Sequence, residues 1–277
     1  MTTYSKSVCI ARDYYNSTDA DRFYYTIWGG EDIHIGLYKT PDENIFDASR
    51  RTVETMARKL SGLKPGAKVI DLGAGFGGAA RWLAKEHGCE VVALNLSEAQ
   101  NKRDREMNKE QGLTDKVDVV DAAFEKLDYP GETFDFVWSQ DAILHSCERE
   151  KVMSEAARVL KPGGEMVFTD PMMTDDCPTS VLQPILDRVH LDTLAWPQFY
   201  KDTAAKLGLE VVEFDDHSHQ LPNHYGRVLK ELESREDELK AAVSEDYIER
   251  MKTGLQHWVE GGNNGHLTWG IFHLRKK

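Results

Sequence analysis

A glycine-rich turn between a strand and a helix constrains this chain more than any other feature. The run VIDLGAGFGG at positions 69–78 is an apolar segment followed by closely spaced glycines. Glycine permits the tight turn that joins a buried strand to a helix, and it lets a ligand approach the backbone without meeting a Cβ atom. Gly73-x-Gly75-x-x-Gly78 in this context predicts a nucleotide-type ligand at the strand end. A tight connection that binds nothing would also need small residues here.

Strands and helices alternate along the following hundred residues. The pattern predicts strands at 67–75, 89–95, 116–122, 134–141 and 165–171, with helices at 79–88, 97–112 and 149–164. Pro162, Gly163 and Gly164 are expected to stop the last of these helices just before its strand. Alternation with short loops indicates a parallel, doubly wound α/β sheet of the Rossmann-like kind.

The two ends of the chain differ from this central part. The segment before Pro65 is aromatic-rich and helical, and its positions 47–60 place apolar residues on one helix face. After position 177 the pattern predicts a helical stretch at 178–207, a strand at 209–216, a polar helical insert at 218–262 and a final strand at 266–276. We therefore expect an N-terminal helical cap over the active site (1–50), a cofactor-binding core (51–177) and a C-terminal part with a helical lid and the final strands (178–277).

Composition limits the partners of the chain. The 277 residues carry 34 basic and 47 acidic side chains, a formal net charge of −13, which argues against nucleic acid and anionic membranes as partners. No stretch is long and apolar enough to cross a bilayer, and the first residues lack the apolar core of a secretory signal. The four cysteines lie far apart, without the spacing of a metal site. These features predict a cytoplasmic protein that binds no metal.

The residues around the turn resemble the first motif of class I methyltransferases, which use S-adenosylmethionine. Asp71 precedes the first glycine by two positions in the run DLGAG. In that family the turn, here Gly73, Ala74 and Gly75, holds the methionyl end of the cofactor, and the preceding acidic residue supports it. The resemblance therefore assigns these four residues to cofactor binding.

The end of the second predicted strand departs from the family pattern. Class I methyltransferases usually have an acidic residue there for the ribose hydroxyls, whereas this strand ends in Asn95, followed by Leu96 and Ser97. An amide can also hydrogen-bond a hydroxyl, and Gln100 lies one helical turn further on. We expect Asn95, Leu96 and Gln100 to bind the cofactor. A capping box formed by Ser97 and Gln100, which would touch no ligand, is the alternative.

Two further strand ends complete the expected cofactor site. Ala122, Ala123 and Phe124 follow the third strand, where the family places its adenine contacts, and the two alanines are small enough to admit a flat ring. A simple helix-start turn is the alternative. Gln140 ends the fourth strand, where the family supplies contacts to the amino-acid part of the cofactor. All these positions lie at carboxyl ends of strands, where open α/β sheets bind ligands.

Longer segments resemble the glycine/sarcosine/dimethylglycine N-methyltransferases of betaine synthesis. The resemblance runs from about residue 12 to the end and includes WSQDAILHS (138–146), VFTDPMMTDDCP (167–178), HQLPNHYGRVL (219–229) and MKTGLQHWVEGG (251–262). It implies a mostly parallel seven-stranded sheet flanked by helices. It also implies methyl transfer to dimethylglycine, leaves sarcosine open as a second acceptor, and gives S-adenosylhomocysteine as co-product. A phosphoethanolamine or lipid-like methyltransferase and a non-catalytic S-adenosylmethionine sensor are the alternatives.

Aromatic residues are the expected binding surface for the acceptor amine. A tertiary amine that takes a methyl group becomes a quaternary ammonium, and aromatic faces stabilise such a cation. Tyr24 and Trp28 share a helix face, and Tyr25 lies three residues from Trp28. Trp196 and Tyr200 repeat the spacing in the C-terminal part. An aromatic stripe buried in the core is the alternative for both groups.

The acceptor's carboxylate end has fewer candidates. The resemblance places acceptor contacts around His145 and at the end of the fifth strand, where Pro171 and Met172 stand, and Tyr225 is a further candidate. The absence of arginine at 170–173 favours an acceptor that already carries methyl groups. We expect His145 and Tyr25 to take part in catalysis, with His190 and His219 as weaker pocket candidates. His145 could equally cap a helix or lie in the core.

Overall fold

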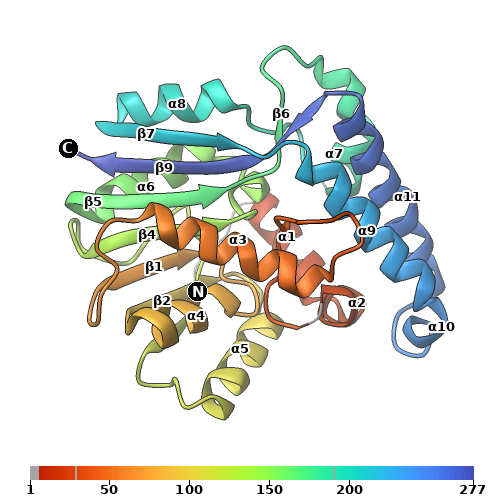
Figure 1. Cartoon of the computed structure of the whole chain (residues 1–277), viewed down its shortest axis with the longest axis horizontal. Helices are drawn as coiled ribbons and strands as arrows, with labels where there is room; N and C mark the ends of the chain where they lie inside the picture. Colours follow the sequence, from red (N-terminus) through yellow and green to blue (C-terminus); the bar gives the residue numbers. More distant parts are fainter. Residues whose placement is uncertain (1–5, 29, 190) are drawn as a thin grey trace.

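The computed structural model describes residues 6–28, 30–189 and 191–277, and its centre is one seven-stranded sheet (Figure 1). In spatial order the strands are β3 (Val117–Asp121), β2 (Glu90–Asn95), β1 (Lys68–Leu72), β4 (Phe134–Gln140), β5 (Leu160–Thr169), β9 (Gly270–Lys276) and β7 (Leu209–Asp216). The first five are parallel, and β9 runs antiparallel between β5 and β7. This arrangement confirms the predicted mostly parallel α/β sheet.

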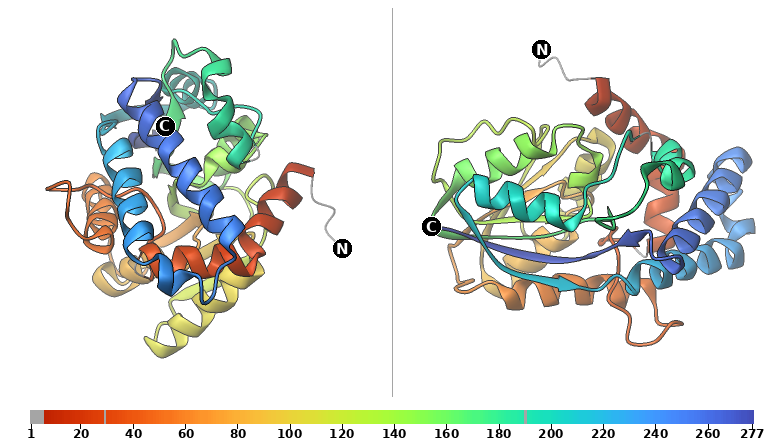
Figure 2. Two further views of the ribbon diagram at one scale, coloured as in Figure 1. Left: turned by 90° about the vertical axis from the view of Figure 1, so that its right-hand side faces the viewer. Right: turned by 90° about the horizontal axis from the view of Figure 1, so that it is seen from above.

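Helices cover both faces of the sheet, which Figure 2 shows from above. On one face α3 (Ile45–Lys59) and α4 (Gly78–His87) pack on Val69, Val91 and Trp138. On the other face α6 (Arg149–Val159) and α8 (Pro197–Lys206) pack on the residues that alternate with these, such as Ile70 and Val137. Helix α5 (Glu98–Glu110) lies against β2 and β3. Burial of both sheet faces explains why the strands read as near-continuous apolar runs.

Two predicted boundaries are wrong in an informative way. Helix α6 already ends at Val159 because Leu160 is extended, and β5 starts there. The predicted stop at 162–164 therefore lies inside β5. There the register with β4 shifts, because Phe134 pairs with Leu160 but Phe136 pairs with Glu165, and the extra residues of β5 form a bulge. The predicted final strand is two strands, β8 (Leu267–Thr268) and β9, of which β8 pairs with β6 (Met172–Met173) in a separate small sheet.

Both chain ends form a helical layer beyond the carboxyl ends of the parallel strands, at the right of Figure 1. The N-terminal contribution is α1 (Lys6–Asn16) and α2 (Thr18–Trp28), and the C-terminal one is α9 (Gln220–Ser234), α10 (Glu236–Leu239) and α11 (Glu245–Asn263). A third apolar cluster joins α2 to α9 and α11, through residues such as Phe23, Val228 and Leu255. The segment between β6 and α8 holds the short helices η2 (Thr179–Leu182) and α7 (Gln183–Val189). We call the layer of α1, α2, α9, α10 and α11 the cap.

None of the described helices is long and apolar enough to span a lipid bilayer.

Candidate active site

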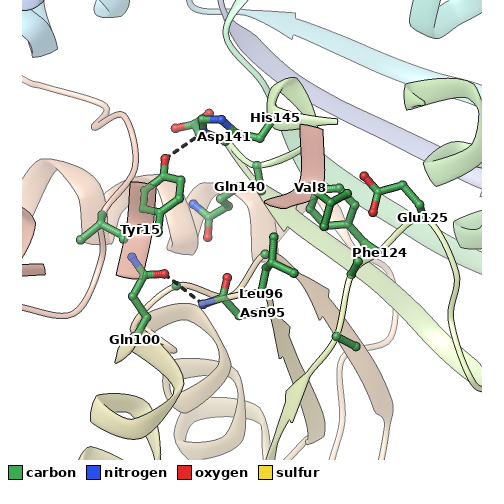
Figure 3. A pocket seen from close by; sticks show the side chains of 16 residues that line it. Val8, Tyr15, Asn95, Leu96, Gln100, Phe124, Glu125, Gln140, Asp141 and His145 are labelled. Carbon is green, nitrogen blue, oxygen red and sulfur yellow. Dashed lines mark hydrogen bonds between the residues drawn. The ribbon is translucent and has the colours of Figure 1, made fainter. Parts of the chain in front are cut away.

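A cavity lies at the carboxyl ends of the strands, beneath the cap, and we call it the first cavity (Figure 3). It encloses about 690 Å³ of space between the atoms, including solvent at its open mouth. Its walls include most residues predicted to bind the cofactor, namely Gly73, Gly75, Asn95, Leu96, Gln100, Ala122, Ala123, Phe124 and Gln140. Asp71 and Ala74 line an adjoining lobe together with Gly73, Gly75 and Gln140. The structure thus brings together all eleven residues of this prediction.

The glycine-rich turn is held tightly at the bottom of the first cavity. The backbone N–H groups of Gly73 and Ala74 both donate to the carbonyl of Leu94, at 2.8 and 3.1 Å. Gly73 has a φ of +86°, and a Cβ atom on it would collide with the methyl group of Ala142. The turn therefore requires glycine here for its backbone conformation and for its close approach to a neighbouring segment.

Two side-chain amides present unsatisfied donors to the first cavity. The Nδ2 of Asn95 donates to Oε1 of Gln100 at 2.9 Å (Figure 3). The Nε1 of Trp138 donates to Oε1 of Gln140 at 2.9 Å. These bonds fix the orientation of both glutamine amides. Their Nε2 atoms are buried and have no hydrogen-bond partner among the described residues. Because an unpaired buried donor costs roughly 1–3 kcal/mol, the pair favours a ligand with acceptor oxygens such as ribose hydroxyls or a carboxylate.

The capping alternative at the start of α5 is partly right. The hydroxyl of Ser97 accepts the N–H of Gln100 at 3.2 Å, so Ser97 is an N-cap. The side chain of Gln100 does not return to the helix end, because Asn95 holds it in the cavity wall. Ser97 therefore caps the helix, while the side chain of Gln100 lines the cavity.

The adjoining lobe is acidic. Asp71 lies there with Glu31 and Asp32, and burial together with the nearby Asp104 and Asp32 raises the pKa of Asp71 well above its ordinary value. Arg50 neutralises part of this charge through its guanidinium group, 2.8 Å from Asp32 Oδ2. A ligand cation in the lobe would relieve the remaining repulsion. The cavity thus has an apolar end at 122–124, amide donors in the middle and an acidic end, which matches the adenine, ribose and amino-acid parts of S-adenosylmethionine.

A second, smaller cavity adjoins the first and is largely aromatic; we call it the acceptor chamber. It shares Tyr15, Ile33, Asp141 and His145 with the first cavity. Its other walls are Tyr24, Trp28, His34, Ile35, Leu144, Pro171, His224, Tyr225 and Trp258. Five residues predicted for the acceptor site are therefore present in the chamber. Because these four residues line both cavities, a ligand in the first cavity would lie next to a ligand in the acceptor chamber.

His145 is held in the shared wall by two neighbours. Its Nε2 lies 2.8 Å from the hydroxyl of Tyr15, and the two rings meet edge to face (Figure 3). The preceding N–H of Leu144 donates to Oδ1 of Asp170 at 2.9 Å, which fixes the short helix η1 (Ile143–His145). Burial raises the pKa of Asp170 to about 7, against the opposing effect of its hydrogen bond from Tyr200. Asp170 therefore positions the loop rather than touching a ligand.

Asp141 is the most constrained residue of the shared wall. It is a non-glycine residue with a φ of +50°, and its carboxylate accepts bonds from the N–H of Ile35 and from Nε1 of Trp269, both at 2.7 Å. Burial raises the pKa of Asp141. The left-handed backbone is strained for aspartate and points to a functional constraint.

Several predicted acceptor residues lie elsewhere. Tyr25 is 42% exposed, with the guanidinium of Arg103 4.1 Å from its ring centre, and it lines neither cavity. Its position on α2 turns it away from the face that carries Tyr24 and Trp28, so the predicted catalytic role is not supported. The spacing in sequence placed Trp28 within reach of both Tyr24 and Tyr25, so it did not exclude Tyr25 from the site.

The C-terminal aromatic pair, Trp196 and Tyr200, also lines neither cavity. Tyr200 is fully buried in the sheet core, where its hydroxyl donates to Asp170 at 2.6 Å, and Trp196 borders a different surface pocket near α6. Met172 is buried in the same apolar cluster as Tyr200. For this pair the core alternative is closer to the structure. His219 lines neither cavity, and His190 lies outside the described residues.

Sequence reasoning missed several residues of the acceptor chamber. Ile33, His34 and Ile35 come from the loop after α2, where no periodic pattern marks a pocket. His224 and Trp258 come from the polar insert, where they lie on the buried faces of α9 and α11. Tyr15 carried a weak signal, because it belongs to the aromatic-rich N-terminal segment.

Comparisons with known proteins agree with this geometry. Residues 70–168 match the family model described as "Methyltransferase domain". The chain is 62% identical to the sarcosine/dimethylglycine N-methyltransferase of Halorhodospira halochloris over 96% of its length and 95% of that protein. It is 56% identical to the protein of the same description from Aphanothece halophytica, with 96% of each chain covered.

A solved structure described as a sarcosine dimethylglycine methyltransferase from Galdieria sulphuraria superposes with a TM-score of 0.89 at 44% identity. The match covers 94% of this chain and 98% of that one. Similarity of this extent includes the cap as well as the sheet. The chain therefore belongs to the S-adenosylmethionine-dependent sarcosine/dimethylglycine N-methyltransferases, which have the class I methyltransferase fold.

Proposed function

We propose that this protein transfers the methyl group of S-adenosylmethionine to the nitrogen of sarcosine and of dimethylglycine, so that the final product is glycine betaine. The observation that carries the proposal is the aromatic acceptor chamber, which shares a wall with the first cavity. The 62% and 56% identical relatives are described as sarcosine/dimethylglycine N-methyltransferases, which supports the same acceptors.

The residues of the first cavity fit the cofactor in three regions. Ala122, Ala123 and Phe124 would pack on the adenine, while the amides of Gln100 and Gln140 would supply donors to oxygen atoms of the ligand. The acidic lobe around Asp71 suits the ammonium group. When bound, S-adenosylmethionine would supply a methyl group on its sulfonium sulfur: the N–C bond to the acceptor forms as the S–C bond breaks, and the sulfur leaves as the neutral thioether of S-adenosylhomocysteine.

The acceptor chamber provides what this reaction requires of the protein. The nitrogen gains positive charge during transfer, and the faces of Tyr24, Trp28 and Tyr225 stabilise such charge. The rings of Tyr24 and Trp28 lie 5.0 Å apart, and those of Tyr225 and Trp258 lie 4.9 Å apart. Because a tertiary amine has no proton to lose on methylation, positioning of the two ligands supplies much of the rate. No general base is needed in the transfer step itself.

The three parts expected from the sequence acquire roles under this proposal. We assign residues 1–50 to a cap over the active site, 51–177 to the cofactor-binding core, and 178–277 to a lid with the final strands. Tyr15 and Trp28 come from the first part and Tyr225 and Trp258 from the last, so helices from both the N-terminal and the C-terminal part contribute walls to the chamber. We place the protein in the cytoplasm, because its four cysteines are all free, as in a reducing compartment.

The test compares acceptors with the purified protein and methyl-labelled S-adenosylmethionine. We expect dimethylglycine to yield glycine betaine and sarcosine to yield dimethylglycine followed by betaine, identified by mass spectrometry. Glycine and phosphoethanolamine serve as comparison acceptors. Methylation of phosphoethanolamine without turnover of dimethylglycine would refute the proposal.

The alternatives make different demands on the chamber. A phosphate-bearing acceptor requires cationic donors, and none of the described residues lining the chamber is lysine or arginine. A non-catalytic sensor would bind S-adenosylmethionine without methylating any amine. The acceptor comparison above distinguishes this outcome, because cofactor binding would then be measured without product.

A further inference from the structure

The acceptor chamber contains buried ring nitrogens without hydrogen-bond partners. Among the described residues that line it, these atoms are Nε2 of His34, Nε2 of His224 and Nε1 of Trp258. His34 Nε2 lies 3.7 Å from a carboxylate oxygen of Asp32, so it has an ionic neighbour. The other two nitrogens belong to the cap helices α9 and α11. Buried polar atoms of this kind are normally satisfied, so the exceptions need an explanation.

The surroundings of His224 fix which of its nitrogens carries the proton. Its Nδ1 lies 3.3 Å from the backbone N–H of Gly36, which can only donate, so Nδ1 must accept. The hydroxyl of Tyr38 lies 2.9 Å from the same Nδ1 and adds a second donor. Burial and the nearby His34 lower the pKa of His224 to about 3, which keeps the ring neutral. The single proton is therefore on Nε2, which is a fixed neutral donor in the chamber wall.

Trp258 supplies a donor of the same kind. Its side chain is 1% exposed, and an indole Nε1–H can only donate. The adjacent ring of Tyr225, 4.9 Å away and inclined by 33°, bridges towards His224, whose ring lies 5.4 Å from that of Tyr225. Two neutral N–H donors thus stand on the cap side of the chamber, within one run of packed rings.

Another part of the chamber lining is the wall shared with the first cavity, and it carries Asp141. This is the one acidic residue among the described residues that line the chamber. An anion is therefore disfavoured at the shared wall and favoured at the cap side. An amino-acid acceptor placed this way would point its nitrogen towards the first cavity.

We propose that Nε2–H of His224 and Nε1–H of Trp258 bind the carboxylate of the acceptor and thereby select amino acids over amines that lack this group. The inference rests on the proposed function and assigns the carboxylate end of its acceptor. Tyr38 and Gly36 act as positioning residues, because they hold the histidine in the required tautomer. Recognition by neutral donors also explains how the chamber binds a carboxylate without arginine or lysine.

The test uses betaine and choline, which share the trimethylammonium group and differ in the carboxylate. Their dissociation constants are measured by calorimetry with S-adenosylhomocysteine present, for the wild type and for Trp258→Phe, His224→Phe and His224→Gln. We expect Trp258→Phe and His224→Phe each to reduce the preference for betaine about 10- to 100-fold, as for loss of a hydrogen bond to a charged group. His224→Gln, which retains N–H donors, should recover part of the preference.

Trp28→Phe is the matched control, because it also removes an indole N–H from the chamber wall. This N–H already donates to the carbonyl of His34 at 3.3 Å, so its removal should weaken betaine and choline equally. The affinity for S-adenosylhomocysteine reports whether each variant keeps its fold. An unchanged betaine preference in Trp258→Phe and both His224 variants, with wild-type turnover of dimethylglycine intact, would overturn this inference alone. A wild type without that turnover would overturn the proposed function as well.

Discussion

Replacement of Gly73 by alanine tests the physical basis of the glycine-rich turn. The residue has a φ of +86°, and a left-handed backbone costs roughly 1–2 kcal/mol for an L-residue with a Cβ atom. The new methyl group would also overlap that of Ala142, and overpacking of this kind costs about 1–3 kcal/mol. We expect Gly73→Ala to lower the free energy of unfolding by about 2–5 kcal/mol, the sum of these two effects.

Two further variants separate the backbone effect from the collision. Gly112 has a φ of +68° with nothing within 4 Å of its Cβ position, so Gly112→Ala should show the backbone effect alone, about 1–2 kcal/mol. Ala142→Gly in the Gly73→Ala background removes the collision and should restore about 1–3 kcal/mol. Gly112→Ala should also leave cofactor affinity unchanged, because the residue lines neither cavity.

Chemical denaturation of the wild type, of the single variants Gly73→Ala, Gly112→Ala and Ala142→Gly, and of the Gly73→Ala/Ala142→Gly double variant provides the stabilities, and calorimetry with S-adenosylmethionine provides the cofactor affinities. The collision model requires Gly73→Ala and Ala142→Gly to be non-additive, with the double variant more stable than the sum of the single changes. Additivity within about 0.5 kcal/mol would refute the model, because it would mean that the two methyl groups do not meet. Retention of full cofactor affinity in Gly73→Ala would in turn refute the role of the turn in shaping the first cavity.

Four other outcomes follow from the site. Gln140→Leu removes an unpartnered donor and should weaken S-adenosylmethionine binding about tenfold in calorimetry; it also removes the acceptor of the buried Trp138 Nε1–H, so the free energy of unfolding should fall by roughly 1–3 kcal/mol. Trp28→Leu should lower kcat/KM for dimethylglycine about 3- to 30-fold through lost cation–π stabilisation, as initial rates would show. Tyr25→Ala should change the same kcat/KM less than about twofold, because the ring faces solvent and Arg103; a larger loss would return Tyr25 to the site. The folded-state pKa of Asp170, about 7, lies above its ordinary value of 3.8, so its stabilising effect is present below about pH 4 and lost as pH rises through 7. Asp170→Asn should reduce the change in the free energy of unfolding between pH 4 and pH 8 by about 4 kcal/mol at most, as denaturation curves across this range would show.

The sheet and the first cavity could be read from the sequence because their signals are local. A strand buried on both faces is an apolar run, and the proposed cofactor-binding residues at the strand ends, such as Asn95 and Gln140, come at the end of such a run. The expected strand at 209–216 matches β7 residue for residue. Parallel strands bring their carboxyl ends to one edge of the sheet, so residues at the ends of successive strands are expected to lie close together.

The acceptor chamber was less predictable because it depends on packing between distant segments. Tyr24 and Tyr25 are adjacent and chemically identical, yet Tyr24 is half-buried against the apolar cluster of α2, α9 and α11, whereas Tyr25 is exposed. His224 and Trp258 are separated by more than thirty residues in an insert whose polar composition suggested only a solvated lid. Their inward orientation follows from the apolar faces of α9 and α11, which pack on each other and on α2.

The position of β9 has a consequence for how this protein must be made. The strand is the last element of the chain, yet it lies between β5 and β7 and pairs with both. Until residues 270–276 have left the ribosome, β7 has no neighbour to pair with, and the edge of β5 is open. The five parallel strands and the glycine-rich turn can form earlier in synthesis, whereas closure of the sheet requires β9. Truncation before residue 270 therefore removes an interior strand, and nascent chains stalled before it emerges should expose β5 to proteases and to edge-to-edge aggregation.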